Sequence, residues 1–289
     1  MMISFGELLV DLIKNGNNYI PLPGGAPANF SVALARLGIR SELVASVGKD
    51  IYGDMLLDCM RKEDVDISNI QVSDKKTSLV FVELKKGIPS FEFQREADLD
   101  IRMEHMNLDF MNARWFHFGS LSLTDNPIRE TLFHCLEQAK QHNLTISFSP
   151  NIRKNMWDQS LDVHMHKALG YVDVLIASES EYEYISKGCG FGKLSKMYGI
   201  DKIVVTKGEN GCEYYSDNTY MSHPAFPVHV VDTTGAGDAF AAGFTFSTLK
   251  GKNERDSLRF ASAVAALSTK KAGAMSSLPH LKDVERFIL

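Results

Sequence analysis

The residues best suited to chemistry lie in the glycine-rich run Val231–Phe240, whose sequence is VDTTGAGDAF. The run comes just before a helical pattern of apolar residues, so its backbone N–H groups are expected at the exposed start of a helix. Such groups, together with the helix dipole, form a site for phosphate oxygens, and glycine lets a phosphate approach closely. Asp238 falls in the first turn and can accept a proton from a hydroxyl that attacks phosphorus. The run therefore predicts phosphoryl transfer to an alcohol. The alternative is a capped helix after a glycine turn.

Two other phosphate-binding patterns are not matched by the chain. The sequence contains no G-x-x-x-x-G-K-[ST], and the nearest approach, residues 188–194, has the wrong spacing and lacks the Ser/Thr. The first expected strand does not lead into G-x-G-x-x-G, so a dinucleotide-binding fold is unsupported.

Composition excludes several classes of function. The chain has 289 residues, 44% of them hydrophobic and 23% charged, as in globular proteins that bury a large core. The net charge of -5 and the lack of a dense basic run argue against nucleic-acid binding. The four cysteines form no Cys-x-x-Cys pair, so no zinc or redox motif is expected. Because no apolar run approaches the roughly 18 residues of a membrane span, and no signal peptide is evident, we expect no membrane partner and a cytoplasmic protein.

Short apolar strands alternate with helical patterns along most of the chain, which predicts a parallel sheet covered on both faces. Segments 77–84 and 90–95 instead mix polar and apolar residues, as in a hairpin with one wet face. We therefore expect a single domain, 1–289, with lid segments at about 12–22 and 75–98. Strands are expected at 3–10, 41–47, 115–118, 145–148, 174–177 and 202–206, a hairpin at 211–222, and helices at 26–37, 52–63, 128–141, 179–186, 191–198, 237–249 and 254–270.

Four segments in order along the chain resemble the PfkB/ribokinase-type carbohydrate kinases: GGAPAN at 24–29, ALARLG at 33–38, GKDIYG at 48–53 and DTTGAGD at 232–238. The resemblance covers nearly the whole chain. It implies an α/β fold, a ribokinase-like three-layer αβα sandwich with a mostly parallel central sheet and a small β-sheet lid. It also implies ATP as a substrate, with Mg²⁺ and in some members K⁺.

The resemblance also implies roles for individual residues. Asp238 matches the catalytic base, and the three residues before it match the anion hole that stabilises the transferring phosphoryl group. A carboxylate and an amide are suited to sugar hydroxyls, which need both acceptors and donors. The anion hole comprises Gly235, Ala236 and Gly237; the sugar positions are Asp11, Gly24, Gly25 and Asn29; the nucleotide-side positions are Thr206, Lys207, Gly208, Gly211 and Ser262. For Asp11 the alternative is a carboxylate in a turn, for Asn29 a helix-face side chain, and for the loop 206–211 a plain turn.

Three serines replace residues that are usual in the family. Ser149 stands in the place of Asp in the segment that carries Asn151 and Arg153, which we assign to the sugar. Ser178 replaces the Asn of an Asn-x-x-Glu motif, so Glu181 alone is left to organise magnesium-bound water. Ser262 stands where Asn is usual beside adenine, which weakens a specific base contact. We expect activity to be retained with an altered magnesium response. Asp232 is a candidate for a monovalent-cation site.

The segment 116–123, FHFGSLSL, resembles the fructokinase branch, as does Asn151-Ile152-Arg153 followed by Met156-Trp157. Arg95 could hold a ketose hydroxyl or the carboxylate of a sugar acid, since a guanidinium favours bidentate carboxylates. The leading hypothesis is thus phosphorylation of D-fructose to fructose 6-phosphate. The alternatives are a 2-keto-3-deoxygluconate kinase, a purine nucleoside kinase and a sugar-binding sensor without turnover. An exposed lid sheet would also favour a homodimer.

Overall fold

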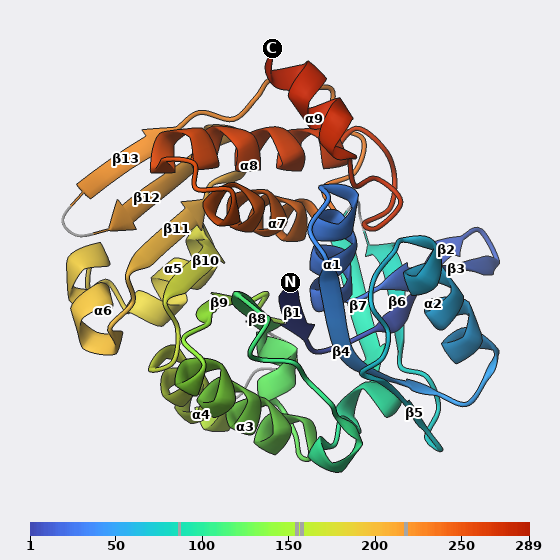
Figure 1. Ribbon diagram of the computed structural model, residues 1–289. Coiled ribbons are helices and arrows are strands. Elements are labelled where there is room, and N and C mark those ends of the chain that lie inside the picture. Colours follow the sequence, from blue (N-terminus) through green and yellow to red (C-terminus); the bar gives the residue numbers. More distant parts are fainter. Residues whose placement is uncertain (86–87, 154–155, 157–158, 217–218) are drawn as a thin grey trace.

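The computed structural model describes the chain except for residues 86–87, 154–155, 157–158 and 217–218. A nine-stranded sheet runs through the molecule in the order β13-β12-β11-β10-β9-β8-β1-β4-β5 (Figure 1). Its strands pair in parallel from β5 to β11, and the last two, β12 and β13, are antiparallel. The strands are β1 (Met2–Phe5), β4 (Ser41–Gly48), β5 (Ile70–Ser73), β8 (Trp115–Gly119), β9 (Thr145–Ser149), β10 (Val174–Ser178), β11 (Lys202–Thr206), β12 (Cys212–Ser216) and β13 (Thr219–His223).

Helices cover both faces of this sheet, so the molecule has three layers, as the family resemblance implied (Figure 1). One core cluster includes apolar residues of α1 (Ala26–Arg36), α2 (Ile51–Lys62), α7 (Ala236–Leu249), α8 (Glu254–Ser268) and α9 (Leu281–Ile288). The other includes residues of α3 (Ile128–Gln141), α4 (Gln159–Leu169), α5 (Glu179–Ser186) and α6 (Phe191–Tyr198). Short 3₁₀ turns lie at Ala97–Leu99, Met103–His105, Ser120–Leu123 and Gly208–Asn210.

The packing of α7 explains its small residues. Residues Ala239–Ser247 are all buried, because α7 lies against both α1 and α8. A side chain at Gly243 would place its Cβ 2.9 Å from the backbone of Ala261, so glycine sets the close approach of the two helices. This packing fixes the start of α7, where Asp238 lies, relative to α1.

A second, four-stranded sheet lies beside the first and has the order β3-β2-β6-β7. It contains β2 (Leu9–Asn15), β3 (Asn18–Gly24), β6 (Leu79–Lys85) and β7 (Ile88–Gln94). The β2–β6 pair is parallel and the two outer pairs are antiparallel. These strands overlap the expected segments 12–22 and 75–98. Residues 86–87, between the two expected strand-like segments 77–84 and 90–95, lie outside the described residues.

The prediction of a single strand over residues 3–10 is wrong. The chain leaves the large sheet after Phe5, turns at Gly6 with φ 144°, and enters the small sheet at Leu9. Both halves are buried, so an uninterrupted apolar run conceals the change of sheet. Strands β3 and β5 and helices α4 and α9 were not expected, whereas the predicted helices and the other predicted strands are present within a few residues. No helix in the described part of the chain combines the length and the apolarity needed to cross a membrane.

Candidate active site

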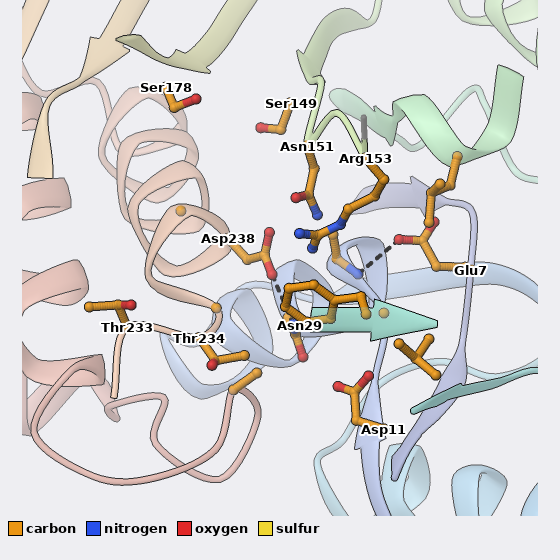
Figure 2. Close-up of a pocket in the computed structure, with 18 of the residues that line it drawn as sticks. Glu7, Asp11, Asn29, Ser149, Asn151, Arg153, Ser178, Thr233, Thr234 and Asp238 are labelled. Carbon is orange, nitrogen blue, oxygen red and sulfur yellow. Dashed lines mark hydrogen bonds between the residues drawn. The ribbon is translucent and has the colours of Figure 1, made fainter. Parts of the chain in front are cut away.

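A cavity of about 370 Å³ lies where the carboxyl ends of the parallel strands, the start of α7 and the small sheet meet (Figure 2). Its walls come from segments far apart in the sequence, as expected for a site at the carboxyl edge of an α/β sheet. The predicted site residues that line it are Asp11, Gly25, Asn29, Asn151, Arg153, Glu181, Thr206, Gly235, Gly237 and Asp238. The structure therefore brings together most of the sugar-side and anion-hole positions.

Asp238 lies in the first turn of α7 and points into the cavity (Figure 2). Its Oδ2 accepts a hydrogen bond of 2.8 Å from Nδ2 of Asn29, on α1. The carboxyl lines the cavity, and desolvation by the surrounding protein raises its pKa to about 7. The bond from Asn29 and the charge of Arg153 lower this pKa, while the charges of Glu7 and Glu181 raise it. A carboxyl with a pKa near neutrality can act as a general base at physiological pH.

The turn before Asp238 is shaped for an anion. Gly235 is the N-cap of α7 with φ 77°, a conformation that favours glycine, and a Cβ there would lie 2.9 Å from Cβ of Ala274. A Cβ on Gly237 would meet nothing within 4 Å, so this glycine faces open space. Asp232 braces the turn, accepting bonds from Thr234 and from the backbone N–H of Gly273. The first-turn N–H groups thus border the cavity beside Asp238.

Two consecutive glycines allow a close approach of neighbouring segments beside the cavity. A Cβ on Gly24 would lie 2.3 Å from Oδ2 of Asp11, on the neighbouring strand β2. A Cβ on Gly25 would lie 2.3 Å from the carbonyl oxygen of Glu7, and Gly25 has φ 109°. Burial raises the pKa of Asp11 to about 6, and the charge of Arg153 opposes that shift. At neutral pH Asp11 is therefore largely an anion that can accept hydroxyl hydrogen bonds.

Arg153 reaches the cavity and Arg95 does not. The Arg153 guanidinium lies 4.8 Å from the ring centroid of Phe91 in the small sheet, and its buried Nε has no partner among the described residues. Arg95 donates from Nε to Asp98 at 2.7 Å and from another nitrogen to Thr124 at 2.6 Å, and both members of the Arg95–Asp98 pair are buried. The expectation that Arg95 holds the substrate is therefore not matched by its position. Trp157, part of the fructokinase-like pattern, lies outside the described residues.

Glu181 binds parts of its own chain with both carboxylate oxygens. Oε2 accepts from the backbone N–H and the hydroxyl of Ser178, at 2.8 and 2.7 Å, and Oε1 accepts from the backbone N–H of Ile152 at 2.8 Å. The serine at 178 thus caps α5 through Glu181, which ties α5 to the segment bearing Arg153. Among the described residues, no group of three or more His, Cys, Asp or Glu side chains could hold a metal ion directly.

A second cavity, of about 810 Å³, adjoins the first and shares Thr206, Thr233 and Gly237 with it. Four of the five predicted nucleotide positions, Thr206, Gly208, Gly211 and Ser262, line it, with Ala236. Lys207 is not among the lining residues, since its Nζ pairs with Glu213 at 2.6 Å and Glu179 at 3.2 Å. Sequence reasoning missed the apolar wall that α7, α8 and the chain before α7 contribute, because no motif marks it: Phe226, Val228, Val230, Phe240, Ala265 and Ala266.

The paired cavities, the anion-binding turn and the base-like carboxyl define a sugar kinase with a ribokinase-like fold. Residues 3–281 match the pfkB family carbohydrate kinases, and the chain belongs to this family. It is 33% identical to the probable fructokinase-2 of Arabidopsis thaliana, over 96% of this chain and 93% of that protein.

Two solved structures show the same fold over the whole chain. Fructokinase from Xylella fastidiosa with bound ATP has a TM-score of 0.93 and 30% identity, covering 99% of this chain and 97% of that one. A double mutant of fructokinase from Vibrio cholerae O395 with fructose, ADP and potassium ion bound has a TM-score of 0.91 and 29% identity, covering 100% and 98%.

Proposed function

We propose that the protein transfers the γ-phosphoryl group of ATP to the 6-hydroxyl of D-fructose, giving ADP and fructose 6-phosphate. The observation that carries the proposal is the position of Asp238 at the start of α7, in the cavity that adjoins the larger, apolar one. The smaller cavity is lined by carboxyl and amide side chains that can bind sugar hydroxyls, and the larger one has apolar walls suited to a nucleotide base. The fructokinases with bound ATP or fructose support this choice of substrates.

The reaction follows from this arrangement. Asp238 takes the proton of the sugar hydroxyl as its oxygen forms a bond to the γ-phosphorus, and the bond from that phosphorus to the bridging oxygen of ADP breaks. The N–H groups of the turn 235–237 stabilise the charge that develops on the transferring group. Asn29 holds the Asp238 carboxylate in place, and Asp11 and Asn151 hold other sugar hydroxyls.

We assign the metal requirement to two residues of this chain. Magnesium, bound to the ATP phosphates, would neutralise their charge. Oε1 of Glu181 accepts one hydrogen bond and has a further lone pair that can accept from a metal-bound water, whereas Oε2 already accepts two, so the residue fits an indirect role through Oε1. For potassium we propose the turn at Asp232, supported by the potassium-bound fructokinase.

A sugar acid is the second candidate substrate. The unpartnered Nε of Arg153 favours it, because a guanidinium in the cavity could bind a carboxylate. Release of ADP should be measured with D-fructose, 2-keto-3-deoxygluconate and purine nucleosides in competition. A preference for the keto acid or a nucleoside would replace fructose as the substrate. Binding of sugar and ATP without release of ADP would make the protein a sensor.

Substitution of Asp238 tests the mechanism. The variant Asp238→Asn should lose at least the 10²–10⁴-fold in kcat that a general base contributes, while calorimetric binding of fructose changes only a few-fold. Asp54→Asn, which changes an exposed carboxylate on α2, is the matched control. Near-normal turnover by Asp238→Asn would remove the residue from the role of base.

We also propose a cytoplasmic homodimer formed through the small sheet. Tyr19 and Ile20 on its outer strand β3 are 38% and 43% exposed, as apolar residues are at an interface. Sedimentation of the wild type and of Ile20→Lys would test this, and a monomeric wild type would rule it out.

A further inference from the structure

Glu7 is a buried carboxyl in the wall of the smaller cavity, and it takes no part in the reaction as proposed. It lies in the link between β1 and β2 and is 3% exposed. Its Oε1 accepts a hydrogen bond of 3.0 Å from the backbone N–H of Ala26 (Figure 2). Its Oε2 is also buried and has no partner among the described residues.

The first of these oxygens has a clear structural use. Helix α1 begins after Gly25, which has no side chain to cap it, and Glu7 supplies the missing acceptor from another segment. Helix α1 carries Asn29, which holds Asp238, so Glu7 and the proposed base are linked through one helix.

The second oxygen has no such structural use. A buried carboxylate oxygen without a donor is costly, because it loses its water and gains nothing in return. The donor is therefore expected from a ligand, and the cavity that Glu7 lines also contains Asp11, Asn29 and Asp238.

We propose that Glu7 is a substrate-binding residue, whose Oε2 accepts a hydrogen bond from a sugar hydroxyl other than the one that is phosphorylated. This inference rests on the proposed sugar kinase function. It adds a second carboxylate, in addition to Asp11, to the groups that would select the sugar.

The charge of Glu7 also acts on Asp238. Four groups face Asp238: Glu7 and Glu181 raise its pKa, and Asn29 and Arg153 lower it. Burial raises the pKa of Glu7 to about 7; backbone hydrogen bonds at Glu7 and Ala26 and the charge of Arg95 oppose this shift, and the charge of Asp98 adds to it. Loss of the Glu7 charge should therefore lower the pKa of the base.

Glu7→Gln is the informative variant, since its amide oxygen can still accept from Ala26. Its KM for D-fructose should rise about ten- to a hundred-fold with the KM for ATP unchanged, the range expected for a hydrogen bond to a charged group. The acidic limb of kcat/KM should move to lower pH. Glu42→Gln is the matched control, because Glu42 is a buried carboxyl on β4 that binds Asn69 and lines neither cavity.

Monodeoxy analogues of D-fructose identify the contact. With the wild type, one analogue should raise the KM by as much as the Glu7→Gln substitution raises it for D-fructose. With the variant, the same analogue should raise the KM little further, because the two changes remove the same hydrogen bond. A fructose KM within two-fold of the wild type, or equal losses for every analogue in both proteins, would overturn the proposal. If the Gln variant does not fold, Glu7→Asp, which keeps the charge but is shorter, is compared in the same way. A wild type without fructose turnover would instead overturn the proposed function.

Discussion

The bond between Asn29 and Asp238 leads to a prediction about pH dependence. Asn29→Ala removes the only side-chain donor that the structure describes on the Asp238 carboxylate. A hydrogen bond to a charged group is worth about 1.5–3 kcal/mol, and one pKa unit corresponds to about 1.4 kcal/mol. Because this bond favours the charged form, its loss should raise the pKa of Asp238 by about one to two units.

The base must be deprotonated, so activity rises with pH through its pKa. Starting from a pKa of about 7, the variant should lose most of its activity at pH 7 and recover much of it by about pH 9. The assay is kcat/KM for D-fructose from pH 5 to pH 9.5 by ADP release. Any direct loss of sugar binding would lower kcat/KM at every pH without shifting the pH at which its acidic limb falls.

Asn69→Ala provides the control for this experiment. Asn69 is also a buried amide that donates to a carboxylate, that of Glu42, but it lies outside both cavities. Its loss should affect stability and leave the limb in place. An unshifted limb in Asn29→Ala, or a shift to lower pH, would refute the reasoning. Glu7→Gln should move the same limb in the opposite direction.

Two further predictions separate structural from functional residues. Arg95→Met should lower the free energy of unfolding by about 3–5 kcal/mol in a urea titration, because it leaves Asp98 buried without its cation. The KM for fructose of the folded variant should be unchanged. Breaking the more exposed pair of Arg102 with Asp100, as a comparison, should lower the free energy of unfolding by about 1 kcal/mol or less. A raised KM at unchanged stability would return Arg95 to the sugar site. Gly237→Ala should raise the KM for ATP without lowering the melting temperature, because the added Cβ meets no protein atom. Gly235→Ala should lower the melting temperature, because an alanine at φ 77° is strained and its Cβ would lie too close to Ala274. Similar effects of the two substitutions would contradict these different roles.

The anion-binding turn could be predicted because its parts are contiguous. Asp238 and the glycines before it need only a local helix start, which the apolar pattern of α7 indicated. Asn29 and Asp11 came from the family resemblance, and only the fold shows that a residue 209 positions away lies within 2.8 Å of Asp238.

The sequence-based expectations that the structure does not match failed for different physical reasons. The run 3–10 is buried in two different sheets, and hydrophobicity does not report a change of sheet. The partner of Arg95 was visible at i+3 as Asp98, but burial decides whether such a pair forms in preference to a ligand contact. Glu7 had one signal, an acidic residue inside an apolar run, but no motif marks it.

The short passage from one sheet to the other determines how the small sheet can rotate. Three residues, 6–8, separate β1 from β2, so the base of β2 is tethered within about 10 Å of the large sheet. The far end of this seven-residue strand lies six steps, or about 20 Å, further on at the usual rise. A rotation of about 10° about the tether would therefore sweep the distal turn through about 4 Å while Asp11, near the pivot, moves only about 1 Å. The positions of β2 that line the cavity would therefore change much less in such a rotation than the turn at the far end of the strand.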